Sequence, residues 1–151
     1  MGSTLSNVLC HLVFSTKRRL PLITTDVQQS LYPLIGTIIR DEKGTLLSIG
    51  GTEDHMHILC KIHPAVSISN MTKKIKGASS KHITKHGLNG GAFEWQRGYA
   101  AFSVSQSMVP KVDTYIQNQV EHHRSSSFRD ELVELLTKHG MEFDEQYVFD
   151  S

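Results

Sequence analysis

The order of the apolar segments constrains the fold more than any other feature of this chain. Continuous or alternating apolar runs predict strands, and apolar residues spaced three and four apart predict helices. They occur here in the order strand, helix, strand, strand, helix, strand, and two more helices follow. This order is typical of the split βαβ unit. We therefore predict an α+β fold with a ferredoxin-like antiparallel sheet, helices on one face, and added C-terminal helices.

The predicted strands cover residues 5–15, 45–49 and 55–63, and a last region joins 93–96 to 99–105. The predicted helices cover residues 27–42, 68–86, 108–123 and 128–139, with caps at Thr24–Asp26, Ser67 and Ser127. In this topology the first and third strands are central neighbours. The length fits one domain, 1–151, with a core at about 5–124 and a C-terminal helix and tail at 125–151.

Two histidines, His55 and His57, lie on the third predicted strand after a turn expected at Gly50–Gly51. Residues i and i+2 of a strand point to the same face, roughly 6–7 Å apart. The two imidazoles can therefore converge on one metal ion, while Met56 points into the core. This spacing predicts a metal site on a rigid strand with open coordination positions.

A tyrosine and a glutamine, Tyr115 and Gln119, lie four residues apart on the third predicted helix. Positions i and i+4 share a helix face. The Gln119 carbonyl oxygen is a candidate third ligand beside the histidines, and the Tyr115 phenol would lie one turn away. Many helices contain this spacing by chance, so it gains weight only together with the histidine pair.

Four ordered segments give the chain a family resemblance. They are HLVFSTKRR at 11–19, GTEDHMH at 51–57, WQRGYAAFSVS at 95–105 and YIQNQVEHH at 115–123. The chain resembles the single-tyrosine HUH transposases of the insertion-sequence 200/605 type over nearly its whole length. HUH denotes His, a hydrophobic residue and His, and Met56 fits the middle position.

The resemblance implies that Tyr115 attacks a DNA phosphodiester, forms a 5′-phosphotyrosine and releases a 3′-hydroxyl. It also implies that His55, His57 and Gln119 hold Mg²⁺ or Mn²⁺. A phenol has a pKa near 10, so it needs such assistance at neutral pH. The phosphotyrosine bond preserves the energy of the broken ester, so rejoining needs no nucleotide cofactor. In agreement, the chain lacks a Gly-x-x-x-x-Gly-Lys phosphate loop.

The partners implied by the resemblance are single-stranded DNA with hairpins and a second copy of the chain. In such a homodimer the tyrosine helix of one subunit completes the site of the other. The loop at residues 87–91 precedes the last strand rather than Tyr115, so the sequence leaves cis and trans placement open. Net charge is only +1, but basic residues cluster and are candidates for phosphate contacts: Lys17, Arg18, Arg19, Lys73, Lys76, Lys81 and Arg97. The aromatic residues Trp95, Tyr99 and Phe102 either stack on bases or fill the core.

The sequence also allows other functions to be weighed. An inactive relative would bind hairpin DNA without cutting it. A histidine-triad hydrolase needs a third histidine at position 59, which is Leu59, and a zinc site with Cys60 fails because Cys60 is on the opposite strand face. His122 and His123 are expected to form a polar helix end. Asp54 either assists the metal site or shapes the turn.

Apolar run lengths, the start of the chain and the cysteines indicate the cellular compartment. No apolar run approaches the ~20 residues that span a bilayer, and no secretory signal is recognisable at the start of the chain. Cys10 and Cys60 are expected to be buried, reduced thiols. We expect a cytoplasmic protein, with no membrane partner, that is associated with the nucleoid when acting.

Overall fold

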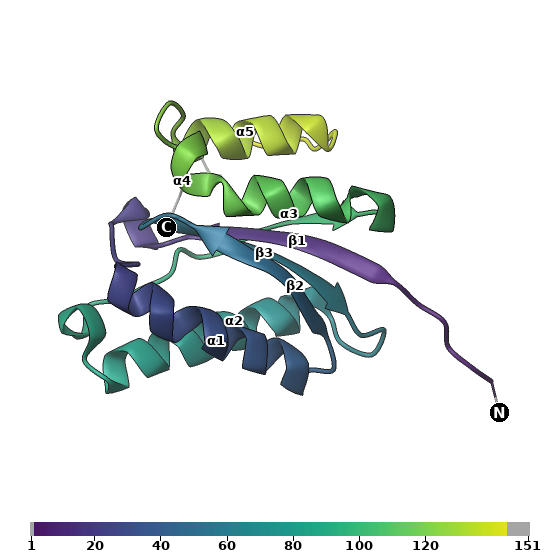
Figure 1. Ribbon diagram of the computed structural model, residues 1–151, viewed down its shortest axis with the longest axis horizontal. Helices are drawn as coiled ribbons and strands as arrows, with labels where there is room; N and C mark the ends of the chain where they lie inside the picture. Colours follow the sequence, from purple (N-terminus) through teal and green to yellow (C-terminus); the bar gives the residue numbers. More distant parts are fainter. Residues whose placement is uncertain (1, 145–151) are drawn as a thin grey trace.

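A four-stranded antiparallel sheet lies between two layers of helices (Figure 1). The computed structural model describes residues 2–144, so residues 145–151 of the predicted tail lie outside the described residues. The strands are β1 (Val8–Ser15), β2 (Thr45–Gly51), β3 (His55–Ile62) and β4 (Ala100–Val104), in the order β2-β3-β1-β4. The predicted α+β sheet is thereby confirmed, with β1 and β3 at its centre.

The helices form two groups on opposite faces of the sheet (Figure 1). One face carries α1 (Thr25–Asp41) and α2 (Ile68–Lys85), and the other carries α3 (Val109–Gln117), α4 (Gln119–His122) and α5 (Phe128–Lys138). Short 3₁₀ turns occupy η1 (Lys17–Arg19), η2 (Leu88–Gly91) and η3 (Gln106–Met108). The side chains of Thr24, Ser67 and Ser127 cap α1, α2 and α5 as predicted. Within residues 2–144, none of the helices combines the length and apolarity needed to cross a bilayer.

Strand alternation divides the interior into two clusters of different character. On the α1–α2 side the main core contains Leu12 and Phe14 from β1 with Met56 and Ile58 from β3. Cys10 and Cys60 lie opposite each other on these two strands, in the same core, as free thiols. Burial raises the pKa of the Cys10 thiol to about 11 and that of the Cys60 thiol to about 12. On the other face a smaller apolar cluster joins the sheet to α5: Val13, Phe102, Phe128, Leu132 and Leu136. The alternation that buries Met56 therefore places His55 and His57 on the face covered by α3–α5.

The last strand is shorter than predicted. Residues 93–96 are not a strand, because only a single bridge joins Trp95 to Thr16. The Gln96 side chain instead accepts hydrogen bonds from the backbone N–H and the hydroxyl of Ser15. Gly98 then turns the chain at φ +77° before β4 begins. The first strand likewise begins at Val8 rather than at residue 5.

The predicted helix over 108–123 is interrupted. Asn118 has φ −96° and ψ 19°, which ends α3 before α4 starts. Asparagine is a poor helix former, yet Asn118 N–H and its carbonyl still bond to Thr114 and His122. The interruption bends the helix without separating its two parts.

Gly50 and Gly51 were expected to form the turn, but they are the last residues of β2. A Cβ on Gly50 would lie 2.5 Å from the backbone oxygen of Ile116 on α3. A Cβ on Gly51 would lie 2.2 Å from the carbonyl oxygen of His55. The glycines are therefore required by close packing, and Gly50 lets the tyrosine helix approach the sheet.

Gly50→Ala is expected to lower the free energy of unfolding by about 1–3 kcal/mol, because the helix backbone must move away from the new methyl group. Urea unfolding measures this change. Gly77→Ala is the matched control, since no atom lies within 4 Å of its added Cβ in α2. That control is expected to gain about 0.4–1 kcal/mol. Equal stability of Gly50→Ala and the wild type would contradict the close approach of α3.

Candidate active site

The histidine pair is buried between the sheet and the C-terminal helices. His55 and His57 are 1% and 0% exposed, and their ring centroids are 5.2 Å apart. Both Nε2 atoms face one carboxylate oxygen, Glu131 Oε1, at 3.4 Å and 3.0 Å. The two imidazoles thus converge as the i, i+2 spacing predicts, and the group they meet comes from α5.

Glu131 is the central residue that the sequence reasoning missed. Its carboxylate is 1% exposed, and its Oε2 atom accepts hydrogen bonds from the Tyr115 hydroxyl and, at 2.9 Å, from Gln119 Nε2. One sequence feature could have indicated that Glu131 is buried: it falls within the apolar stripe that Phe128 and Leu132 form on α5. A glutamate is almost never fully buried unless it is paired.

Tyr115 and Gln119 both reach the histidines from the bent helix. Gln119 Oε1 lies 2.9 Å from His55 Nε2, and the Tyr115 ring lies edge-on to His57 at 5.6 Å. The structure therefore brings together all four residues that the resemblance places in the active site. It does so within one chain.

His122 and His123 lie at the C-terminal end of α4, as expected, but their rings face the cluster. His123 Nε2 lies 3.0 Å from Gln119 Oε1 and 3.1 Å from Glu131 Oε1. His122 Nε2 lies 3.6 Å from Glu131 Oε2 and has no hydrogen-bond partner among the described residues. Both rings turn inward because Glu131 supplies the negative charge that they face.

The second ring nitrogen of each strand histidine is held by a neighbour. His55 Nδ1 lies 2.7 Å from Asp54 Oδ1 and 3.0 Å from Thr52 Oγ1, and Thr52 also donates to Asp54. His57 Nδ1 lies 2.8 Å from Nε2 of His11, a buried residue of β1. Such partners fix the ring orientation of metal-binding histidines. Asp54 therefore contacts both the turn residue Thr52 and His55, and it orients the His55 ring.

The cluster shifts the pKa of its members in opposite directions. Burial lowers the pKa of His55, but hydrogen bonds to Asp54 and Glu131 outweigh it and raise the value to about 9. His57 shares Glu131 but lacks a second carboxylate, so complete burial keeps its pKa below the usual value. Burial also lowers the pKa of His11 to about 3.

The pKa values of Glu131 and Tyr115 are also shifted by their neighbours in the cluster. Burial opposes ionisation of Glu131, but hydrogen bonds from His55 and His57 outweigh burial and hold its pKa far below the usual value. Burial and the neighbouring Glu131 carboxylate raise the pKa of Tyr115 well above 10. The resting site therefore contains an anionic glutamate and a neutral tyrosine.

These shifts predict a stability optimum near pH 6.5 for the metal-free protein. The pKa of His55 is raised on folding, so its contribution is complete below about 6.5 and is lost as the pH rises through 9. The pKa of His11 is lowered, so stability falls as the pH drops from about 6.5 toward 3. The alkaline arm is worth on the order of 3 kcal/mol and the acid arm on the order of 5 kcal/mol. Urea midpoints in EDTA across this range measure the curve, and His55→Gln should flatten only the alkaline arm. An unchanged alkaline arm in that variant would contradict the assignment.

The donor set fits a divalent cation. His55, His57 and Glu131 place ligand atoms within 4.8 Å of one another, and so do His122, His123 and Glu131. With Nδ1 of His55 facing a carboxylate, its Nε2 is the atom left to bind a metal ion. Imidazole nitrogens, an amide oxygen and a carboxylate are ordinary ligands of divalent metals.

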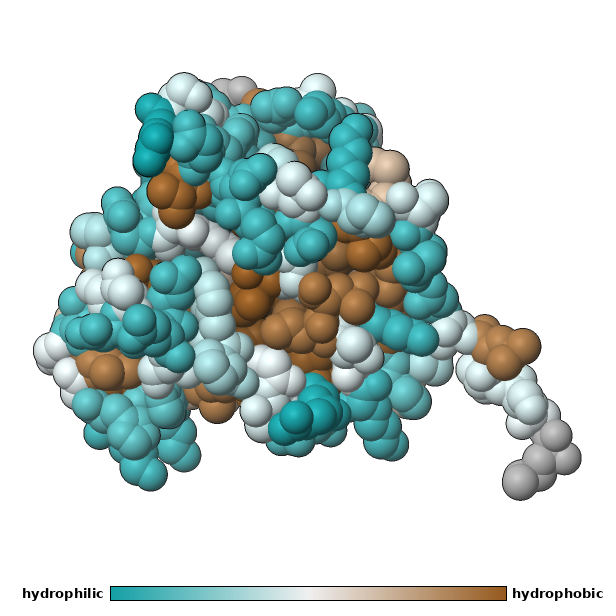
Figure 2. Space-filling model, in the orientation of Figure 1, coloured by the Kyte–Doolittle hydropathy of each residue, from teal (hydrophilic) through white to brown (hydrophobic). Residues whose placement is uncertain are grey.

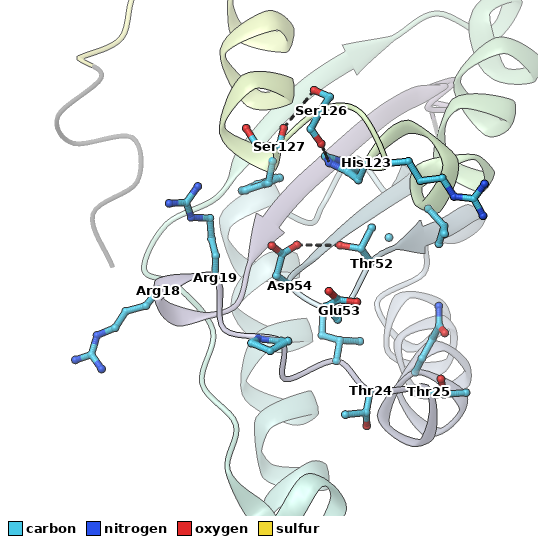
Figure 3. A pocket seen from close by; sticks show the side chains of 17 residues that line it. Arg18, Arg19, Thr24, Thr25, Thr52, Glu53, Asp54, His123, Ser126 and Ser127 are labelled. Atoms are coloured by element: carbon cyan, nitrogen blue, oxygen red, sulfur yellow. Dashed lines mark hydrogen bonds between the residues drawn. The ribbon is translucent and has the colours of Figure 1, made fainter.

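A groove of about 950 Å³ opens beside this cluster (Figure 3). Arg18 and Arg19 of η1 flank it on one side, and His123, Ser126 and Ser127 flank it on the other. Thr52 and Asp54, the residues that hold His55, also line it, as does Arg124. The groove therefore reaches residues that contact His55 rather than the two strand histidines themselves.

The predicted phosphate-contact residues do not form one surface. Lys17 pairs with Glu94 at 3.2 Å, and Lys76 donates to the carbonyl oxygens of Gln96 and Gly98. Burial lowers the pKa of Lys76 to about 8. Arg18 and Arg19 line the groove, but Lys73 and Lys81 are exposed on α2, across the sheet from the histidines (Figure 1), and Arg97 is exposed before β4. Of the aromatic candidates, Trp95 and Phe102 pack in the two cores, whereas Tyr99 is 40% exposed.

The fold and this tyrosine–histidine site define a class of enzyme that rearranges DNA. Residues 4–119 match the family model described as "Transposase IS200 like". The chain belongs to this transposase family. His123 and Glu131 lie beyond the matched residues.

Individual relatives agree with the family. The chain is 25% identical over 115 residues to the ISDra2 transposase TnpA of Deinococcus radiodurans, covering 72% of this chain and 81% of the relative. It is 25% identical over 130 residues to the IS200 transposase of Salmonella typhimurium, covering 82% and 84%.

Two solved structures share the fold. A putative transposase from Deinococcus radiodurans R1 has a TM-score of 0.63 at 23% identity, covering 79% of this chain and 95% of that one. A REP-associated tyrosine transposase bound to a REP hairpin has a TM-score of 0.59 at 18% identity, covering 99% and 90%.

Proposed function

We propose that this transposase cleaves and rejoins single-stranded DNA at hairpin-containing ends, with Tyr115 as the nucleophile. One observation carries the proposal. The Tyr115 hydroxyl, the two strand histidines and Gln119 all meet at the Glu131 carboxylate in one buried cluster.

The chemistry is a transesterification. The Tyr115 oxygen attacks phosphorus, the new O–P bond forms, and the bond from phosphorus to the 3′-oxygen breaks. The products are a 5′-phosphotyrosine and a free 3′-hydroxyl. Glu131 Oε2 accepts the phenolic hydrogen and so orients the Tyr115 oxygen, and the phenolic proton passes, directly or through Glu131, to the leaving 3′-oxygen. Rejoining reverses these steps and needs no nucleotide cofactor.

His55, His57 and Gln119 would hold the divalent cation, Mg²⁺ or Mn²⁺. When bound, such an ion polarises the scissile phosphate and offsets its developing charge. The protein orients the two histidine ligands, because Asp54 holds the ring of His55 and His11 holds the ring of His57. Glu131 keeps the tyrosine protonated until substrate arrives, since the anion raises the pKa of Tyr115.

The groove supports a single DNA strand as substrate. It places Arg18, Arg19 and Arg124 beside threonine and serine hydroxyls, the groups that contact phosphates and sugars. A family relative of the same fold was solved bound to a hairpin, which favours hairpin DNA over unstructured strands for this chain. Such binding would occur in the cytoplasm, where the DNA of a prokaryotic element lies.

The assembly we propose is a homodimer with a cis site in each subunit. Tyr115 lies beside the histidines of its own chain, which supports cis placement. A central apolar area lies over the β2 side of the sheet (Figure 2), where β2 is an edge strand and Leu47 is 39% exposed. An exposed apolar edge strand is a natural pairing surface. Sedimentation velocity measures the mass.

The decisive experiment incubates the protein with single-stranded hairpin DNA and Mn²⁺ or Mg²⁺. A covalent protein–DNA adduct on denaturing gels, mapped to Tyr115 by mass spectrometry, is the expected result. Tight hairpin binding without an adduct in either metal, on DNA carrying the element's own ends, would instead identify a binding protein that does not cut.

A further inference from the structure

The segment after Gln119 brings two further metal-type donors to the histidine cluster. We propose that His123 and Glu131 bind the same metal ion as His55 and His57, and that the three imidazoles select Mn²⁺ over Mg²⁺. The inference rests on the proposed metal-assisted function. It adds ligands from beyond the residues that match the family model.

Hydrogen bonding at the other ring nitrogen leaves His123 Nε2 to face two oxygens. His123 Nδ1 lies 2.6 Å from the carbonyl oxygen of Ser126, so Nε2 is the ring atom placed to bind a metal ion. This nitrogen lies 3.0 Å from Gln119 Oε1 and 3.1 Å from Glu131 Oε1. All three atoms are ordinary ligands of a divalent cation, which would place a positive charge between them.

The amide of Gln119 is held in one orientation. Its nitrogen lies 2.9 Å from Glu131 Oε2 and 3.4 Å from the Tyr115 carbonyl oxygen, and both of these atoms are acceptors. The amide oxygen must therefore face the histidines. It lies near His55 as well as His123, because His55 Nδ1 faces Asp54 and His55 Nε2 faces Gln119 Oε1.

The spacing of the histidine nitrogens from the two oxygens matches a coordination shell. The distances that join His55, His57 and His123 to the two oxygens run from 2.9 to 3.4 Å. Neighbouring ligand atoms lie roughly 2.9–3.5 Å apart around an ion with bonds of about 2.0–2.2 Å. Glu131 belongs both to the donor group with His55 and His57 and to the one with His123, so one ion bound at its carboxylate would draw the two groups together.

The chemistry of this set determines the preferred ion. Mg²⁺ favours oxygen ligands and keeps several waters, whereas imidazole nitrogens favour transition metals. Three imidazoles with one carboxylate and one amide oxygen therefore favour Mn²⁺ among the two ions that the family implies.

Calorimetric titration of EDTA-treated full-length protein tests the selectivity without DNA. We expect Mn²⁺ to bind at least about 10-fold more tightly than Mg²⁺, and His123→Ala to weaken Mn²⁺ binding about 10–100-fold. Glu131→Gln, which keeps the shape but removes the charge, should weaken both ions. His86→Ala is the matched control, because His86 is exposed at the end of α2 on the other face of the sheet. Its Mn²⁺ affinity should equal that of the wild type.

Pulsed EPR of bound Mn²⁺ counts the coordinating imidazoles and needs no variant. Three nitrogens are expected in the wild type, and two in His123→Ala. Two nitrogens in the wild type, or unchanged affinity in a folded His123→Ala, would overturn this inference while leaving metal-assisted cleavage intact. Failure of the wild type to bind either ion, with no DNA adduct, would overturn the proposed function itself.

Discussion

Tyr115→Phe is expected to abolish the covalent DNA adduct while leaving hairpin affinity within about twofold of the wild type. The substitution removes one oxygen, and that oxygen is the proposed nucleophile. The phenyl ring keeps its packing against His57 and His122, so the fold should persist. Removal of a nucleophile that acts with its base costs on the order of 10⁶ in rate in well-studied hydrolases. Denaturing gels measure the adduct, and fluorescence anisotropy measures the affinity.

Tyr32→Phe provides the matched control. Tyr32 lies on α1, and its hydroxyl accepts a hydrogen bond from Gln28 at 2.9 Å, on the face of the sheet away from the histidines. This variant should form the adduct at the wild-type rate. A Tyr115→Phe protein that still forms the adduct would remove Tyr115 from the mechanism.

His57→Ala is expected to remove metal-induced stabilisation and to slow adduct formation by at least about 100-fold. His57 is fully buried, and its loss removes one donor from the cluster and leaves His11 and Glu131 without a shared partner. Thermal unfolding with and without Mn²⁺ reads the metal effect separately from catalysis. The wild-type melting temperature should rise with Mn²⁺, and that of the variant should not.

The exposed His86 again serves as the control, since His86→Ala should behave as the wild type in both assays. If folded His57→Ala retained the full Mn²⁺-induced shift, the strand histidines would not be ligands. Normal adduct formation by the same variant would place the chemistry elsewhere.

Local patterns were sufficient for the element order and for part of the site. The i, i+2 spacing on β3 and the i, i+4 spacing of Tyr115 and Gln119 depend only on the geometry of one element. The structure places all four side chains in one cluster, even though Asn118 interrupts the helix between them. The capping residues Thr24 and Ser127 were predictable for the same local reason.

Contacts between distant segments were beyond such reasoning. Glu131 meets His57 across 74 positions of sequence, and His11 meets His57 across 46. Contacts at such separations leave no periodic pattern in the sequence, so the contacts of Glu131 could not be predicted. Gly50 was assigned to a turn for a similar reason, because only the approach of α3 shows why a side chain cannot fit there.

The ferredoxin-like order of strands and helices, the HUH pair and its partner residues on a later helix were all predictable from local sequence patterns. These features follow from backbone periods of two and 3.6 residues, which act within single elements. Packing between distant segments, in contrast, places α5 over the histidine face, joins Tyr115 to the metal-type donors through Glu131, and turns His123 inward. Those outcomes depend on burial of the Phe128 and Leu132 stripe against β1 and β4, which carries a carboxylate into the interior, where charged partners must surround it.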